Sequence, residues 1–473
     1  MAADTNMRLT RRKLMQYVMA GAGATFLAAC QPRTVEVEHT VKETVIVEGE
    51  PQVVEKVVKE TVVVEKTPEP AKGVKITMYH AWHRAIAGPV IEPMVREFEE
   101  ANPGLFIALT GAVPAELGPM TMAAVAAGTP PSITWGSFGP LVRANAVVPV
   151  DEYIEQAGYE VDQLYSYLAD AYTIGGKLMA MPVENSSVSY WWHNSLLQKA
   201  DLDKPTSDWD WNDLVEYGRK LTIFEGGAPA QYDLVQHMNQ VFYFQTLLYQ
   251  LGGSYLNEDL TAPAFNSEEG VKAMQFVADL ILKEQVVPPP GGGFTDGFVS
   301  EKYAMAFDGP WRFGNWVNEL GLDVETVIHP KNPDTGRQDT IVYGNTLQVM
   351  KTNPEEQSAA ATFLMWFLGK EMNARWSIET GYLPIRVDSA QTEEYQKFLA
   401  GPGSVMQSFL EGFDHGHFRE GSVVLPKYSE INTIFNDECW DRVALGERTV
   451  EEGLEAAEKM IMADSTLFER IDL

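Results

Sequence analysis

Strand-like and helix-like patterns alternate along residues 74–136, and this alternation restricts the fold more than any other feature of the chain. Short apolar runs that end in loop residues are typical of buried strands, and they occur at 74–80, 105–109 and 132–136. Helical spacing of apolar residues covers the segments between them, at 90–100 and 120–127. Strands that alternate with helices predict a parallel sheet with helices on its faces. Ligands of such sheets bind beyond the carboxyl ends of the strands.

The stretch from Gly175 to Asn194 follows a different pattern. A Gly-Gly-Lys turn leads into an apolar run that ends at Pro182, then into polar residues, and then into a second strand-like run that contains two tryptophans. A proline inside a strand pattern marks an edge or an exit from a sheet. We interpret the stretch as a crossing from one α/β lobe to another, which begins near Pro182 and ends near Tyr190. An ordinary β-hairpin turn explains the same residues equally well.

The first thirty residues have the features of an export signal. Arg11 and Arg12 form a twin-arginine pattern, and the apolar segment 17–29 that follows is too short to span a bilayer as a mature helix. Leu27-Ala28-Ala29-Cys30 resembles the lipobox of bacterial lipoproteins, which implies cleavage before Cys30 and a lipid on its sulfur. A transmembrane anchor with an incidental cysteine is the alternative. We expect Cys439, in a helical pattern, to be a small buried apolar residue.

Residues 31–72 form a degenerate repeat of Val, Thr, Glu and Lys that ends in Pro68 and Pro70. Valine favours strands, but a lone repeat with charges throughout has no second face to bury. The composition therefore predicts a disordered tether. The formal net charge of −30 makes nucleic acid a poor partner, whereas eleven tryptophans offer flat apolar faces for stacking.

Seven further motifs occur along the rest of the chain, and in this order they resemble the extracellular solute-binding proteins of ABC importers, of the family 1 (maltose-binding-like) type. They lie at 98–104, 176–182, 251–253, 265–270, 303–311, 343–345 and 380–384. His193 stands where the family usually has Asn, and Asp201 replaces a usual Gly. Helix starts are predicted after Asp208 or Asp210, after Ser267 and after Asn353.

The resemblance implies an α/β, two-lobed periplasmic-binding-protein fold (type II), in which each lobe is a doubly wound sheet flanked by helices and hinge crossings join the lobes. It places further crossings near residues 343–346 and 385–392. The expected segments are a signal peptide at 1–29, the lipidated Cys30 and disordered tether at 30–72, lobe 1 at 73–184 and 346–388, and lobe 2 at 185–345 and 389–473.

A sugar has hydroxyls around its edge and apolar C–H faces, so its site needs aromatic rings flanked by side chains that donate and accept hydrogen bonds. The resemblance places family ligand contacts near Trp135, Glu184 and Trp311. Each other candidate has the alternative of an ordinary core residue. The predicted ligand-binding residues are Trp82, His83, Trp135, Glu184, Asn185, Gln240, Tyr243, Asp308, Trp311, Tyr343, Asn345 and Tyr382.

These features predict the substrate-binding component of an ABC importer, lipid-anchored on the outer face of the cytoplasmic membrane. It would capture a carbohydrate, most simply an oligosaccharide, and deliver it to the membrane permease by hinge closure. We expect a monomer with no cofactor, no catalytic residue and no nucleic-acid partner. The pairs His80/His83 and His415/His417 lack the spacing of known zinc patterns, so no metal site is expected.

Other functions fit parts of the same sequence. A surface glycoside hydrolase needs a pair of carboxyl groups, and sequence does not reveal the separation of the many Asp and Glu side chains. A sensor partner that presents a bound ligand to a receptor would differ only in its docking surface. The ligand class also stays open to a polyol or a sugar phosphate, although the acidic composition argues mildly against the phosphate.

Overall fold

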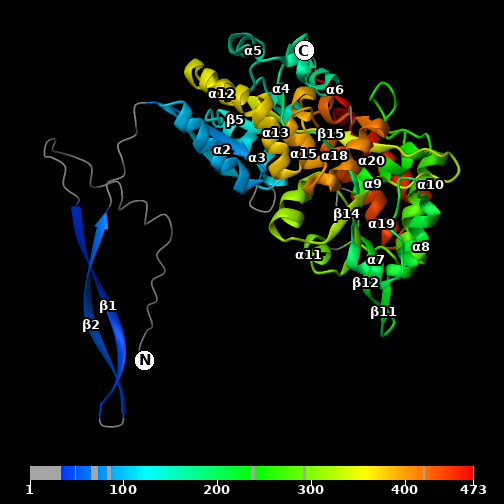
Figure 1. The fold of residues 1–473 in the computed structure, drawn as a ribbon, viewed down its shortest axis with the longest axis horizontal. Helices are drawn as coiled ribbons and strands as arrows, with labels where there is room; N and C mark the ends of the chain where they lie inside the picture. Colours follow the sequence, from blue (N-terminus) through cyan, green and yellow to red (C-terminus); the bar gives the residue numbers. More distant parts are fainter. Residues whose placement is uncertain are drawn as a thin grey trace. The chain divides into compact units, whose positions relative to one another are not determined.

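The computed structural model describes residues 33–47, 50–64, 73–82, 87–235, 240–290, 294–418 and 421–471. The chain divides into an N-terminal unit, Met1–Lys72, and a main unit, Gly73–Leu473 (Figure 1). The predicted export residues Arg11 and Arg12, the predicted lipidation residue Cys30 and the predicted ligand residue His83 lie outside the described residues.

The N-terminal unit contains two paired strands. β1 (Arg33–Val47) and β2 (Glu50–Val64) run antiparallel, with Arg33 opposite Val64 and Val47 opposite Glu50. This pairing differs from the disordered tether expected from composition. The β-branched residues of the repeat favour extended backbone, and the repeat is long enough to fold back on itself.

Lobe 1 is built on a five-stranded sheet in the order β4-β3-β5-β16-β8. β3 pairs in parallel with β4 and β5, as predicted, while β16 and β8 add antiparallel pairing. The strands are β3 (Val74–His80), β4 (Leu105–Gly111), β5 (Ile133–Trp135), β8 (Met181–Pro182) and β16 (Thr346–Val349).

Helices from the first part of the main unit and from residues 354–380 cover this sheet. Phe98 of α2 and Phe363 of α12 meet with ring centroids 5.1 Å apart, and the hydroxyls of Thr121 on α3 and Thr134 on β5 lie within hydrogen-bond distance. The larger elements are α2 (Gly88–Ala101), α3 (Pro114–Ala126), α12 (Pro354–Phe367) and α13 (Lys370–Thr380). The smaller ones are α4 (Phe138–Arg143), α5 (Asp151–Ala157), η1 (Val161–Gln163), α6 (Ser166–Ala171), β6 (Thr173–Ile174) and β7 (Lys177–Leu178).

Lobe 2 is built on a second five-stranded sheet in the order β11-β12-β13-β10-β14. Successive side chains of a strand point to opposite faces. On β10, Tyr190 and Trp192 accordingly join the larger cluster of buried apolar residues, while Trp191 joins a smaller one with Trp316 and Phe409. Both faces of this sheet are therefore covered. The strands are β10 (Ser189–His193), β11 (Ile223–Glu225), β12 (Ala228–Val235), β13 (Tyr303–Asp308) and β14 (Val324–Val327).

The helices around the second sheet begin where the sequence predicted. Asp210 caps α8 and Ser267 caps α10, as Asn353 caps α12 in lobe 1. Cys439 is fully buried, as expected. The first group comprises α7 (Asn194–Lys199), α8 (Trp211–Leu221), α9 (Gln240–Gln250), α10 (Glu268–Ala278), the π-helical η2 (Asp279–Lys283), α11 (Phe294–Val299), η3 (Pro310–Arg312) and η4 (Phe313–Glu319).

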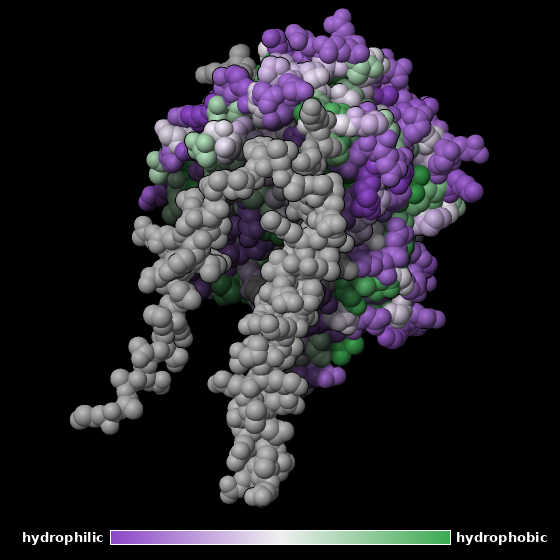
Figure 2. Space-filling view, turned by 90° about the vertical axis from the view of Figure 1, so that its left-hand side faces the viewer, coloured by the Kyte–Doolittle hydropathy of each residue, from purple (hydrophilic) through white to green (hydrophobic). Residues whose placement is uncertain are grey.

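The C-terminal part of the main unit is helical, and much of it lies against α9 and α10 (Figure 1). It comprises α14 (Val387–Ala390), α15 (Glu393–Leu399), η5 (Pro402–Met406), α16 (Gln407–Glu411), η6 (Gly412–His415), α17 (Gly421–Val424), α18 (Tyr428–Phe435), η7 (Asn436–Trp440), α19 (Asp441–Ala444), α20 (Val450–Met462) and η8 (Ser465–Phe468). Hydrophilic residues dominate the face seen in Figure 2, in keeping with the acidic composition.

A small third sheet joins the two lobes. It has the order β17-β15-β9, formed by β9 (Ser186–Ser187), β15 (Thr340–Tyr343) and β17 (Gly416–Phe418). The chain passes from β8 of the first sheet through β9 into β10 of the second, and it returns from β15 to β16. The stretch at 182–190 is therefore a crossing and not a hairpin. The exact lobe boundaries at 184, 345 and 388 stay predictions.

In the part of the chain that the structure describes, no helix combines the length and apolar character that crossing a bilayer requires.

Candidate functional site

Several hydrogen-bond donors converge on the carboxylate of Glu184, which is 1 % exposed. Its Oε1 accepts from the indole Nε1 of Trp82 at 2.6 Å and from that of Trp135 at 3.0 Å. Its Oε2 accepts from Nδ2 of Asn345 at 2.5 Å. The hydroxyl of Tyr382 also hydrogen-bonds to this carboxylate. Five of the twelve predicted ligand residues therefore form one connected group.

The first sheet explains why these side chains meet. Trp135 ends β5 and Trp82 follows β3, so both come from the carboxyl edge of the parallel strands. β16 runs antiparallel to β5 and β8, which brings Asn345 at its start and Glu184 after β8 to the same edge. This is the edge where open α/β sheets bind ligands.

Burial and hydrogen bonding act in opposite directions on Glu184. Removal from water raises the pKa of its carboxyl group above the ordinary value, and the bonds from Trp82, Asn345 and Trp135 oppose that shift. Burial, together with the nearby Glu184 carboxylate, raises the pKa of Tyr382 well above its ordinary value. The phenol of Tyr382 is therefore protonated at neutral pH and donates to Glu184.

Aromatic rings continue the group toward lobe 2. The ring of Trp311 lies 6.3 Å from that of Tyr382 and 6.0 Å from that of Tyr343. Trp311 comes from η3, directly after β13 of the second sheet. The turn before it requires glycine, because a Cβ on Gly309 would lie 1.9 Å from the Trp311 ring. Trp82, Trp311 and Tyr382 are buried, whereas Trp135, Tyr343 and Asn345 are half-buried.

Asp308 stabilises this turn by hydrogen bonds. Its Oδ2 accepts from Nε of Arg312 at 2.7 Å, and its Oδ1 accepts from the backbone N–H of Gly309 at 2.8 Å. The guanidinium of Arg312 in turn lies 5.2 Å from the Trp316 ring centroid. Asp308 is fully buried, so in this structure it holds the Trp311 turn.

The structure places the other three described candidates elsewhere. Asn185 ties two crossings together, because its Oδ1 accepts from the Tyr167 hydroxyl at 2.5 Å and its Nδ2 donates to the Pro384 carbonyl at 3.1 Å. The hydroxyl of Tyr243 pairs with that of Tyr190 at 3.0 Å inside the lobe 2 core. Gln240 donates to Asp441 at 3.1 Å.

Trp376 belongs to the aromatic group, although it was not among the residues predicted from the sequence. Its ring lies 4.6 Å from that of Trp82, and parallel to that of Tyr382 at 6.2 Å. It stands in α13, and a tryptophan within a helical pattern is ordinarily a core residue. Its proximity to the motif at 380–384 was the available signal.

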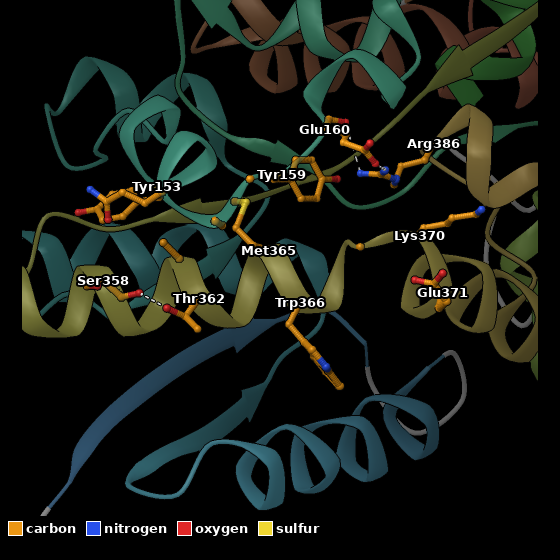
Figure 3. Close-up of a pocket in the computed structure, with 15 residues that line it drawn as sticks. Tyr153, Tyr159, Glu160, Ser358, Thr362, Met365, Trp366, Lys370, Glu371 and Arg386 are labelled. Carbon is orange, nitrogen blue, oxygen red and sulfur yellow. Dashed lines mark hydrogen bonds and ion pairs between the residues drawn. The ribbon is translucent and has the colours of Figure 1, made fainter.

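Two cavities of about 690 Å³ lie in lobe 1. One opens at the carboxyl ends of β3 and β4, and Trp82 is part of its wall. The other lies between α5 and α12 (Figure 3), and no predicted ligand residue lines it. In Figure 3 Trp366 points away from Tyr153 and Tyr159. The first cavity shares Trp82 with the Glu184 group.

Within the described ranges, His, Cys, Asp and Glu side chains do not gather in groups of three. His417 hydrogen-bonds to Asp339 and stacks on Tyr249 with ring centroids 4.7 Å apart.

The sequence matches the model of the bacterial extracellular solute-binding protein family over residues 93–400. A relative from Sinorhizobium fredii, designated a probable amino-acid ABC transporter periplasmic-binding protein, is 24% identical over 230 residues. That match covers 47% of this chain and 50% of the relative. The arabinooligosaccharide-binding protein of Bacillus subtilis is 23% identical over 275 residues, covering 56% of this chain and 59% of the relative. The chain thus spans little more than half of these curated relatives.

Solved structures show the same fold. An ABC substrate-binding protein of Listeria monocytogenes in complex with cycloalternan superposes with a TM-score of 0.73 and is 23% identical. The match covers 83% of this chain and 98% of that protein. The two-lobed periplasmic-binding-protein fold predicted from the sequence is therefore confirmed.

Proposed function

The chain belongs to the bacterial extracellular solute-binding protein family, and from this premise we propose that it is the carbohydrate-binding component of an ABC importer. One observation carries the proposal: Glu184 holds the indoles of Trp82 and Trp135 by their N–H groups, beside the rings of Trp311, Tyr343 and Tyr382. Fixed aromatic faces suit the apolar C–H faces of a sugar, and the polar atoms among them suit its hydroxyls. The oligosaccharides named for two similar proteins support the same ligand class.

Hinge closure is the proposed mechanism. Trp82 and Trp135 come from the first sheet and Trp311 comes from the second, so a ligand between them would touch both lobes. A ligand favours the closed state only through contacts that the open state lacks. To move the equilibrium from mostly open to mostly closed, it must supply roughly 5.5 kcal/mol of differential binding. The permease would then recognise the closed form.

The N-terminal motifs complete the proposal. We infer lipid attachment at Cys30 after export through the twin-arginine signal, which would hold the protein on the outer face of the cytoplasmic membrane. Each buried methylene of an acyl chain contributes about 0.8 kcal/mol, so several chains anchor a protein firmly. The extracellular family supports this side of the membrane. A monomer without cofactor or metal is part of the proposal.

The alternative is a surface glycoside hydrolase, and the site geometry favours it less. Such enzymes need two carboxyl groups that face the scissile bond. Glu184 is bonded to donors on both oxygens, and Asp308 is paired with Arg312. We therefore propose a non-catalytic protein that returns its ligand intact. Chromatography of an oligosaccharide after incubation tests this point, because shorter products would support the hydrolase.

A melting-temperature screen tests the ligand class. The panel should contain neutral oligosaccharides, polyols, sugar phosphates and amino acids, since one similar protein is designated for amino acids. A ligand present at a hundred times its Kd should stabilise the folded protein by about 2.7 kcal/mol. We expect this shift with a neutral oligosaccharide. A shift with amino acids alone would contradict the proposed ligand.

A further inference from the structure

The cavity at the carboxyl ends of β3 and β4 combines apolar walls with one imidazole. Ile91, Leu109 and Val113 contribute the apolar part, and Trp82 borders it with the same indole that donates to Glu184. Its volume of about 690 Å³ lies within the range of small-ligand sites, which is about 300–1,000 Å³. The cavity is therefore an extension of the candidate site and large enough to hold part of a ligand.

His80 is the group in this wall whose hydrogen bonding is incomplete. Its side chain is 5 % exposed and stacks against Trp82, with ring centroids 5.8 Å apart. Nδ1 is buried without a hydrogen-bond partner, whereas Nε2 is not among the buried unpartnered atoms, and no hydrogen bond joins Nε2 to a described residue. Nε2 is therefore the ring nitrogen that another molecule can reach, and a hydrogen bond there would offset part of the cost of burying the imidazole.

The second large cavity provides the contrast. Arg386 lines the cavity between α5 and α12. It donates hydrogen bonds to both carboxylate oxygens of Asp388 at 2.8 Å, and its guanidinium lies 4.8 Å from the Tyr159 ring centroid. The Tyr159 hydroxyl donates to the Leu368 carbonyl at 2.9 Å, and Thr362 donates to Ser358, as the dashed line in Figure 3 marks. These polar groups are already paired within the protein, so they do not need a ligand to complete their hydrogen bonds.

We infer that the cavity beside β3 and β4 is a subsite for one hydroxyl-bearing ring of a neutral saccharide, and that Nε2 of His80 hydrogen-bonds to a hydroxyl of that ring. The inference rests on the proposed function and extends it by naming a specificity-determining residue. A hydroxyl both donates and accepts, so it pairs with either tautomer of a neutral imidazole. The apolar walls meet the C–H face of the ring.

The charge state of His80 agrees with a neutral ligand. Burial lowers the pKa of its imidazole to about 4, although Glu92 acts in the opposite direction. The ring is therefore uncharged at neutral pH, and it offers a hydrogen bond without a positive charge. An uncharged imidazole beside Glu92 suits a hydroxyl better than a phosphate.

Replacement of His80 by leucine separates ligand recognition from structural support. His80→Leu removes both ring nitrogens but keeps a buried side chain of similar size. We expect the affinity for the best saccharide of the screen to fall about tenfold by calorimetry, which is the effect of one lost hydrogen bond. The urea midpoint should not fall, because an apolar group replaces an unpaired polar one. His80→Gln, which retains a donor and an acceptor, should recover part of the affinity.

His329→Leu is the matched control. His329 is also buried with an unpartnered nitrogen, but it lies in lobe 2 beside Tyr190 and Phe307. Its replacement should leave saccharide affinity at the parent value. A series of deoxy sugars identifies the hydroxyl. One deoxy analogue should bind the parent more weakly than the full sugar does, whereas His80→Leu should bind that analogue and the full sugar equally well. Parent-like affinity in His80→Leu, with saccharide binding intact, would overturn the inference alone. An absence of any saccharide binding to the parent would instead overturn the proposed function.

Discussion

Glu184 keeps a carboxylate in a fully buried position, where it receives hydrogen bonds from two indoles, an amide and a phenol. Burial raises its pKa in the folded protein above the unfolded value of about 4.3. The folded state therefore binds this proton more tightly, so the contribution to stability is complete below about pH 4.3 and is lost as pH rises through the raised pKa. Glu184→Gln should remove this pH dependence.

The measurement is the urea-derived free energy of unfolding of parent and variant between pH 4.5 and 7.5. The difference, variant minus parent, should increase with pH across this range. Glu455→Gln, at an exposed position on α20, should show no such trend. Parallel curves for parent and Glu184→Gln would refute the assigned role of burial.

At the same scale, strand ends and motifs were enough to predict most of the connected group. Trp82, Trp135 and Glu184 follow strands, so the sheet topology alone brings them together. The sequence could not distinguish Tyr243, a core residue, from these site residues, because α9 is buried on nearly every side and its sequence has no polar face. The role of Asp308 was also ambiguous from the sequence, because its ion pair with Arg312 depends on the turn between the two residues.

At the scale of elements, the start of α8 offers a direct test of a predicted cap. The Asp210 side chain accepts from the backbone N–H groups of Asn212 at 2.7 Å and Asp213 at 3.1 Å. Asp210→Ala should lower the free energy of unfolding by about 1 kcal/mol, measured by urea denaturation. Asp208→Ala is the matched control, because Asp208 is exposed and pairs across the surface with Lys331. Equal losses in the two variants would contradict the cap assignment.

Elements were predicted correctly where several local sequence signals agreed. They were missed where the structure of a segment depends on the strand with which it pairs. α2 has clear helical spacing and was predicted nearly in full, and the start of α12 was predicted at Asn353. The pairing of β1 with β2 depends on two copies of one repeat meeting in register, which composition does not reveal. The two-residue strands β8 and β9 are too short for a pattern, and only the change of sheet identifies the crossing.

At the scale of the whole molecule, the proposed anchor predicts where the protein is found. Cys30→Ser removes the sulfur that would carry the lipid, and the acyl chains supply the membrane affinity. We expect the parent in the membrane fraction and the variant in the soluble fraction after cell disruption, as measured by immunoblot. Saccharide affinity should be the same in both. Retention of Cys30→Ser in the membrane would point to the alternative transmembrane anchor.

The lobes must separate before a ligand enters. Trp311 and Tyr382 are each 6 % exposed in this structure, so a sugar reaches little of their faces unless the lobes move apart. By small-angle scattering, saturating saccharide should reduce the radius of gyration of the ligand-free protein. Trp311→Ala removes a lobe 2 contact that only the closed state makes. A lost aromatic contact of about 1.4 kcal/mol weakens binding about tenfold, and the reduction in radius should require correspondingly more saccharide. Trp366→Ala truncates a half-buried indole on the far side of lobe 1 and should change neither quantity. If the Trp311→Ala variant closes at the same saccharide concentration as the parent, lobe 2 binds its ligand through other side chains.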